Sequence, residues 1–171
     1  MKTRDIMQSV SALQTARPSE TLAGVARKMT EHRVSALPVV NDSFRVVGMI
    51  SERDLLSRAE QSSKTEDLKI LKSPLFHSPF ALLQEESSTE ELSDLAQSFS
   101  KVGQTKVEEA MTRDVVLANE EDSVGALVQR MTEHNINHIP IAKDGTLTGL
   151  VARQDVLCAL SNFARENPKA F

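Results

Sequence analysis

Apolar side chains recur every three or four residues in two stretches of the chain, residues 22–29 and 124–131. This spacing places them on one face of a helix, so each stretch is predicted to form an amphipathic helix. Thr21 and Ser123 directly precede the two stretches. Both are predicted N-caps, because a hydroxyl oxygen can accept a hydrogen bond from a backbone amide of the first helical turn.

Two short apolar runs follow each predicted helix. They read "ALPVV" (36–40) and "VVGMI" (46–50) in the first set, and "HIPIA" (138–142) and "LTGLV" (147–151) in the second. A polar turn separates the two runs of each set, which predicts a pair of strands. A second helix is expected to begin directly after each pair.

The two sets are copies of one another. Residues 29–32 ("MTEH") recur as residues 131–134, and a short segment upstream of each helix is also similar. Each copy is expected to build its own sheet in the order strand, helix, strand, strand, helix. Such a unit leaves one sheet face uncovered by its own helices, and two copies can cover each other. The predicted fold is therefore α/β, with two pseudo-symmetric repeats packed sheet to sheet.

The duplication divides the chain into a first repeat (1–60), an insertion (61–103), a second repeat (104–165) and a C-terminal tail (166–171). A capping residue, Ser88, an apolar stripe and Gly103 predict a helix in the insertion. The stripe comprises Leu92, Leu95, Ala96, Phe99 and Val102. We expect this helix to pack on the repeats or on a partner subunit. Membrane attachment through Phe76 and Phe80 is the weaker alternative, because the flanks are not rich in Lys or Arg.

Composition argues against several classes of protein. The 171 residues carry a net charge of −4, without the basic excess of a nucleic-acid-binding protein. No apolar run reaches the ~18 residues of a membrane helix, and the chain does not begin like a signal peptide. Cys158 is the one cysteine, so no internal disulfide can form. A cytoplasmic location is expected.

Candidate chemistry lies where the second strand of each copy meets the following helix, in "GMISERD" (48–54) and "GLVARQD" (149–155). An ionised Asp54 can accept both hydrogens of a ribose 2′,3′-diol, and Ser51 adds a hydroxyl beside it. The second copy keeps Asp155 but has Ala152 in place of the serine. A helix capping box is the structural alternative. We expect it to fail in the second copy, because Ala152 has no side chain that can cap.

No catalytic site is predicted. The chain has no nucleophile motif and no glycine-rich phosphate loop. His134 and His138 are four residues apart, but the intervening segment reads as loop and strand, so the two rings are not expected to share a metal. The protein is therefore not expected to be an enzyme or to hold a metal ion.

The repeated motifs resemble a tandem pair of cystathionine-β-synthase (CBS) domains, also called a Bateman module. The resemblance rests on "MTEHRVSALPVV" with "GMISERDLL", and on "MTEHNINHIPIA" with "GLVARQDVL", and covers residues 1–58 and 104–162. Members of this family bind adenosine-containing ligands in clefts between the repeats. They usually regulate other proteins and do not catalyse reactions.

The resemblance implies ligand contacts at two places in each repeat. One is the ribose motif, which Ser51 and Asp54 complete and which Asp155 retains in part. The other is the segment before the proline-containing strand. The residues there are Val34, Ser35 and Ala36 in the first repeat and Ile136, Asn137 and His138 in the second. Basic residues in this segment hold phosphates in nucleotide-binding relatives, and here His138 alone is of that kind.

The implied function is regulatory. The expected ligand is AMP, ADP, ATP, S-adenosylmethionine or NAD, with no obligatory cofactor, and the expected assembly is a homodimer that acts on a separate target protein. The site of Asp54 is expected to favour ribose. The site of His138 is expected to favour phosphate, most strongly below pH 6.5, where imidazole is charged. The alternative is a dimeric adaptor protein with vestigial sites, which the altered second motif supports.

Overall fold

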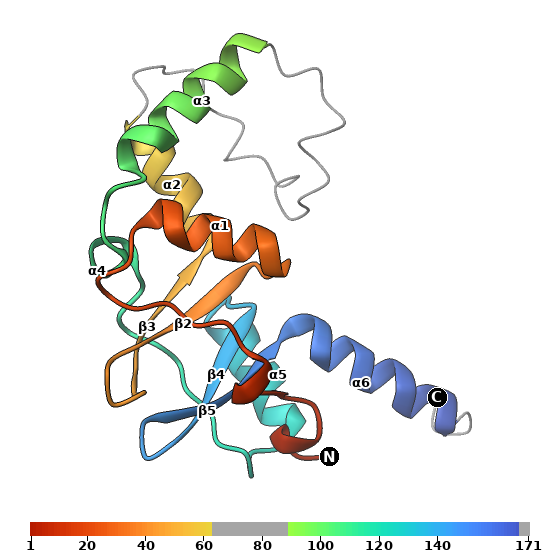
Figure 1. The fold of residues 1–171 in the computed structure, drawn as a ribbon. Helices are drawn as coiled ribbons and strands as arrows, with labels where there is room; N and C mark the ends of the chain where they lie inside the picture. The colour runs from red at the N-terminus through yellow and green to blue at the C-terminus, as the bar shows by residue number, and fades with distance from the viewer. Residues whose placement is uncertain (63–88, 168–171) are drawn as a thin grey trace. The chain divides into compact units, whose positions relative to one another are not determined.

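The computed structural model describes residues 1–62 and 89–167 (Figure 1). The first repeat contains α1 (Leu22–His32), β2 (Ala36–Val40), β3 (Val46–Ser51) and α2 (Glu52–Ser62), and the second contains α5 (Val124–Glu133), β4 (His138–Lys143), β5 (Thr146–Ala152) and α6 (Arg153–Glu166). Strand β1 (Gln8–Ser9) lies between two short 3-10 helices, Thr3–Asp5 and Val10–Ala12. Helix α3 (Thr89–Val102) lies between the repeats in sequence, and helix α4 (Val107–Ala110) lies near the start of the second repeat. The α/β fold class is confirmed.

The elements gather into two compact units that cut across the repeats. The first unit comprises Met1–Arg17, Ala36–Met49 and Thr112–Phe171, and the second comprises Pro18–Ser35 and Ile50–Met111. The first unit therefore contains the second repeat from Thr112 onward and most of the strand residues of the first repeat. The second unit contains helices α1 to α4.

Both predicted N-caps are confirmed. The Thr21 hydroxyl oxygen accepts a hydrogen bond from the amide of Gly24 at 3.2 Å, and the Ser123 hydroxyl oxygen accepts one from Ala126 at 3.2 Å. Each cap satisfies an amide that the first helical turn would otherwise leave without a partner. The starts of α1 and α5 are thus fixed by equivalent interactions.

An ion pair at matching positions ties each of these helices to the loop before it. Lys28 Nζ lies 2.7 Å from a carboxylate oxygen of Glu20, and an Arg130 guanidinium nitrogen lies 2.6 Å from a carboxylate oxygen of Asp122. A hydrogen bond from the Asn119 amide, reinforced by Arg130, lowers the pKa of Asp122. The repeat is therefore preserved in polar contacts as well as in the apolar pattern.

Two small sheets carry the strands. Strands β2 and β3 form one sheet, and β1, β5 and β4 form the other, with β5 in the centre. Strand β4 runs antiparallel to β5, with His138 opposite Ala152 at one end. In the first unit a buried apolar cluster joins β4 and β5 to α5 and α6, and Leu127, Ile139, Ile141 and Val151 are its fully buried members. Burial of this apolar surface stabilises the second repeat.

The turns of the two strand pairs are hydrogen-bonded to each other. The amide of Val46 donates a hydrogen bond to the carbonyl of Gly145, and the amide of Leu147 donates one to the carbonyl of Phe44, both at 3.1 Å. In the alignment of the repeats, Val46 matches Leu147 and Phe44 matches Gly145. These two bonds are therefore symmetry-equivalent, and they join the strand pairs of the two repeats within the first unit.

The prediction that each repeat builds its sheet from its own three strands is wrong. Strand β1 belongs to the first repeat in sequence, but it pairs antiparallel with β5 of the second repeat, with Gln8 opposite Leu150 and Ser9 opposite Gly149. The amide of Thr3 also donates to the carbonyl of Asp122, at 2.9 Å. Residues 2–9, the first leading segment, are therefore contributed to the second repeat.

The exchange is reciprocal. Residues 105–112, the second leading segment, bond to the first repeat. In the first unit, Thr112 and Met49 exchange two backbone hydrogen bonds of 2.9 Å. In the second unit, the amide of Leu22 donates to the carbonyl of Thr105 at 2.9 Å. A strand pattern predicts that a segment will pair with a sheet edge. It does not distinguish between the similar edges of two repeats, so the exchange was not predicted from the sequence.

The chain returns to its own repeat a few residues later. The amide of Ala16 donates to Pro38 on β2 at 2.9 Å, and the amide of Val40 donates back to Ala16 at 3.0 Å. The equivalent Ala118 bridges to β4 in the same way. The stretches from residue 2 to Ala16 and from residue 105 to Ala118 therefore each make backbone contacts with both repeats.

The helix predicted in the insertion is confirmed as α3, which packs along α2 in the second unit (Figure 1). Phe99 and Val102 of the predicted stripe are half-buried, whereas Ala96 is exposed and Ser98 is buried. The side chains of Leu92 and Leu95, together with Ser88, Phe76 and Phe80, lie outside the described residues. Among the residues that are described, no helix has the length and apolar character needed to cross a membrane.

The first prediction concerns the contact between β1 and β5. A Cβ atom at position 149 would lie 2.7 Å from the carbonyl oxygen of Gln8 and 2.8 Å from the sulfur of Met7. Gly149→Ala should therefore push β1 away from β5 and lower the free energy of unfolding by about 1–3 kcal/mol, the usual cost of overpacking. Denaturant unfolding of the purified variant measures this change.

Gly125→Ala is the matched control, because a Cβ there would meet nothing closer than the Ser123 hydroxyl oxygen, at 3.9 Å. In helix α5 this change should raise the free energy of unfolding by about 0.5–1 kcal/mol. Equal effects of the two substitutions would contradict the close approach of β1.

Candidate functional site

The first candidate site lies where β3 ends and α2 begins. The carboxylate oxygen Oδ2 of Asp54 accepts hydrogen bonds from the Ser51 amide at 2.8 Å and from the Ser51 hydroxyl at 2.6 Å. The amide of Glu52 donates to the carbonyl of Ser35 at 3.0 Å. The second unit therefore holds Ser35, Ser51 and Asp54 together, as the resemblance implies.

The two remaining residues predicted for the first repeat differ in their accessibility. Val34 is half-buried and its amide donates to the carbonyl of Met29 at the end of α1. Ala36 begins β2 in the first unit and is only 3% exposed. Ala36 is therefore part of the buried core.

The second candidate site lies at the equivalent junction of β5 and α6, entirely within the first unit. The amide of Arg153 donates to the carbonyl of Asn137 at 2.8 Å, which matches the bond between Glu52 and Ser35. His138 is opposite Ala152 in the β4–β5 register. Asn137, His138 and Asp155 are therefore neighbours. Ile136 packs against the buried cluster of the second repeat.

The expectation that a helix cap fails in the second repeat is wrong. Oδ2 of Asp155 accepts a hydrogen bond from the amide of Ala152 at 2.7 Å. The cap needs only the backbone N–H three residues before the aspartate, so loss of the serine hydroxyl leaves this half of the capping box in place. Both aspartates therefore have a structural role, and Asp54 has one further bond from Ser51.

The carboxylates of Asp54 and Asp155 differ in the surroundings of their Oδ1 atoms. Among the described residues, the hydrogen bonds of Asp54 all go to Oδ2, which leaves Oδ1 as an acceptor. In contrast, Oδ1 of Asp155 lies 3.5 Å from the side-chain amide nitrogen of Gln8. No motif in the sequence indicated Gln8, because this residue reaches the second repeat only through the exchange of leading segments.

The pKa of His138 is lower than the value of 6.5 that the sequence-based expectation assumed. Burial lowers the pKa of His138, Arg153 lowers it further, and Asp155 opposes them without reversing the shift. The imidazole therefore takes up its proton at a lower pH than an ordinary histidine does. A phosphate-binding role for His138 would accordingly begin at a lower pH than the expected 6.5.

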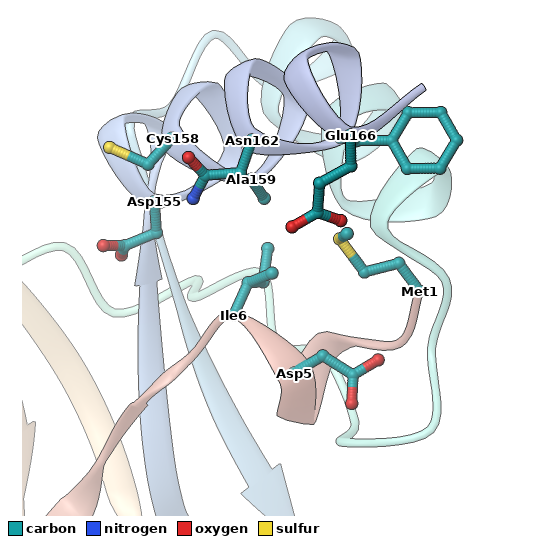
Figure 2. Close-up of a pocket in the computed structure, with 9 residues that line it drawn as sticks. Met1, Asp5, Ile6, Asp155, Cys158, Ala159, Asn162 and Glu166 are labelled. Carbon is teal, nitrogen blue, oxygen red and sulfur yellow. The ribbon is translucent and has the colours of Figure 1, made fainter. Parts of the chain in front are cut away.

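A pocket of about 330 Å³ lies beside Asp155, between the start of the first leading segment and one face of α6 (Figure 2). Three carboxylates, those of Asp5, Asp155 and Glu166, line it. The other lining residues are Met1, Ile6, Cys158, Ala159, Asn162 and Phe163. None of the lining residues is Lys, Arg or His, so the pocket disfavours a phosphate group. Sequence reasoning identified only Asp155 among them.

The sequences of both repeats match a known family. The CBS domain model matches residues 4–60 and 107–162 of the chain. The chain belongs to the CBS domain family. It is a tandem CBS pair, and an uncharacterized protein of Methanocaldococcus jannaschii is 33% identical to it over 141 residues, which is 81% of this chain and 80% of that protein.

Solved CBS pairs share the fold. CBSX2, an Arabidopsis thaliana protein whose structure was determined in complex with AMP, superimposes with a TM-score of 0.68 at 21% identity and covers 94% of this chain and 97% of its own. A CBS domain pair in complex with 5′-methylthioadenosine and S-adenosylmethionine gives a TM-score of 0.64 at 19% identity, covering 95% and 97% of the two chains. At these identities the likeness establishes the fold of this CBS pair.

The second prediction follows from the lowered pKa of His138. Since the unfolded state binds the proton more readily than the folded state, stability should fall as the pH drops below about 6.5. His138→Asn and His138→Gln remove this titration, so the free energy of unfolding should depend less on pH between 7.5 and 5. Denaturant unfolding across this range measures the difference. The same slope in the parent and in both variants would show that burial of His138 does not shift its titration.

Proposed function

We propose that this CBS pair is a non-catalytic regulatory module that binds an adenosine-containing ligand through Ser51 and Asp54. The observation that carries the proposal is the geometry of the Asp54 carboxylate. Oδ2 is held by two hydrogen bonds from Ser51, which fix the orientation of the group, and Oδ1 remains as an acceptor. A pre-oriented, charged acceptor of this kind suits the hydroxyl groups of a ribose.

The ligands of related structures support this class of ligand. Those structures contain AMP in one case and 5′-methylthioadenosine with S-adenosylmethionine in another. All three molecules share an adenosine-type nucleoside, and they differ in the group at the 5′ position. We therefore propose that the nucleoside is recognised first, with AMP, ADP, ATP, S-adenosylmethionine and NAD as candidates.

We propose a weaker site in the second repeat, formed by Ile136, Asn137, His138 and Asp155. Three features weaken it for nucleotides. Ala152 supplies no hydroxyl group, a neutral His138 supplies no positive charge at neutral pH, and three carboxylates line the adjoining pocket. Ligands with an uncharged or cationic 5′ group should consequently be preferred there over polyphosphates.

Regulation requires a partner, and the exposed face of α6 is a candidate surface. Leu157, Leu160 and Phe163 are 54%, 49% and 46% exposed and lie along this helix. Apolar side chains grouped in this way on a surface are typical of protein interfaces. We propose that the protein forms a homodimer and acts on a separate target protein.

The second candidate function is an adaptor dimer whose ligand sites are vestigial. The caps at Ser51 and Ala152 favour it, because they explain why an aspartate stands at the equivalent position of both repeats without any ligand. The two functions make opposite predictions for Asp54. In an adaptor, Asp54 stabilises α2 and nothing more.

The third prediction separates these functions. Asp54→Ala should weaken binding of AMP or S-adenosylmethionine by roughly thirty-fold, since hydrogen bonds to a charged group contribute about 1.5–3 kcal/mol. Ser51→Ala should weaken it less. Asp54→Asn is the control, because it keeps an oxygen for the Ser51 amide and so preserves the cap while the charge is lost. Titration calorimetry measures affinity, and thermal unfolding verifies that the fold is intact.

In the parent protein, a ligand at 100 times its dissociation constant should add about 2.7 kcal/mol to the free energy of unfolding. The absence of a thermal shift with all of the candidate ligands would support the adaptor. Parent-like affinity of Asp54→Ala would show that Asp54 serves only as a helix cap.

The fourth prediction concerns the dimer. Light scattering at tens of micromolar should give the mass of two chains for the parent protein. Leu160→Asp should favour the monomer, because it places a charge in the proposed apolar contact. A monomeric parent protein would contradict the homodimer, and a dimeric Leu160→Asp variant would place the contact elsewhere.

A further inference from the structure

The exchange of leading segments places Gln8 beside a carboxylate of the other repeat. The backbone of Gln8 is fixed by the pairing of β1 with β5, where it lies opposite Leu150. Gly149 lets the two strands approach closely. From this position the side-chain amide nitrogen of Gln8 reaches to 3.5 Å from Oδ1 of Asp155.

The consequence is a difference in acceptor capacity between two otherwise equivalent carboxylates. Asp155 has a donor at each oxygen, the Ala152 amide at Oδ2 and the Gln8 amide at Oδ1. In the described structure Asp54 has donors only at Oδ2. A ribose diol approaching Asp155 must therefore compete with Gln8 for Oδ1, whereas one approaching Asp54 meets an open oxygen.

We propose that Gln8 determines the affinity of the second site for vicinal diols by competing for Oδ1 of Asp155. This inference rests on the proposed function, because it presumes that the aspartates bind ribose. The contact is at the long limit for a hydrogen bond and is exposed to solvent, so a ligand can displace it. The side chain acts as a weak internal competitor that raises the ligand concentration at which the second site fills.

The two sites should then respond over different concentration ranges. The first site should fill first, because Oδ1 of Asp54 needs no displacement. The second should fill only after the Gln8 side chain has rotated away. Gln8 on β1 pairs with the second repeat, and Ala16, eight residues later, bridges to β2 of the first repeat. The side chain that the ligand displaces therefore belongs to a segment that contacts both repeats.

The test isolates the second site in an Asp54→Ala background. Adenosine supplies the diol, and 2′-deoxyadenosine, which lacks one of the two hydroxyl groups, is the paired probe. In this background Gln8→Ala and Gln8→Leu should each bind adenosine about three-fold more tightly than the background alone. Their affinity for 2′-deoxyadenosine should change less, because this ligand offers only one hydroxyl to Asp155. Titration calorimetry supplies both affinities.

Ser9→Ala is the matched control on the same strand, since the Ser9 hydroxyl bonds with that of Ser11 and not with Asp155. It should leave both affinities unchanged. Three results would each contradict competition for the diol. They are weaker adenosine binding by Gln8→Ala, unchanged adenosine binding, and an equal gain in affinity for adenosine and 2′-deoxyadenosine. One outcome would reject this inference but retain the proposed function. In it, Asp54→Ala weakens adenosine binding as predicted, and the Gln8 substitutions do not change the affinity that remains in that background.

Discussion

The rest of the structure depends on the backbone pairing of each repeat with the leading segment of the other. In the first unit, β1 completes the sheet of β4 and β5, and Thr112 pairs with Met49 on β3. In the second unit, Thr105 accepts a hydrogen bond from the amide of Leu22 at the start of α1. These bonds satisfy strand edges and helix starts that would otherwise lack partners. Neither repeat is therefore complete from its own residues.

The candidate site uses a group that the fold already needs. A carboxylate three residues after the strand end caps the following helix in both repeats. The cap consumes one oxygen and orients the other, which is how a structural contact can prepare an acceptor for a ligand. The difference between the repeats lies in what else approaches the carboxylate, a serine hydroxyl in the first and Gln8 in the second. If the aspartates bind ligand as proposed, ligand binding and helix stability are coupled at Asp54 and Asp155.

Local features were predictable from the sequence. The spacing of apolar residues identified α1 and α5, and Thr21 and Ser123 cap them as predicted. The insertion helix was also predicted. These features depend on neighbours within a few residues, so their physical causes are visible in a short stretch of sequence.

Features that depend on distant partners were not predictable. The pairing of β1 with β5 requires a choice between two similar edges, and the position of Gln8 follows from that choice. The cap at Ala152 is local, but it depends on a backbone amide, which every residue except proline carries, so the side-chain pattern did not indicate it. The lowered pKa of His138 depends on burial, which the sequence pattern did not reveal.

The most direct test of the account is a structure of the protein crystallised with adenosine. The account predicts that the 2′- and 3′-hydroxyl oxygens of the ribose lie within hydrogen-bonding distance, about 2.5–3.0 Å, of the Asp54 carboxylate. It also predicts that Oδ2 keeps its bonds to Ser51 while Oδ1 accepts from the ribose. A bound adenosine whose ribose makes no contact with Asp54 would contradict the assignment of this carboxylate as the ribose acceptor.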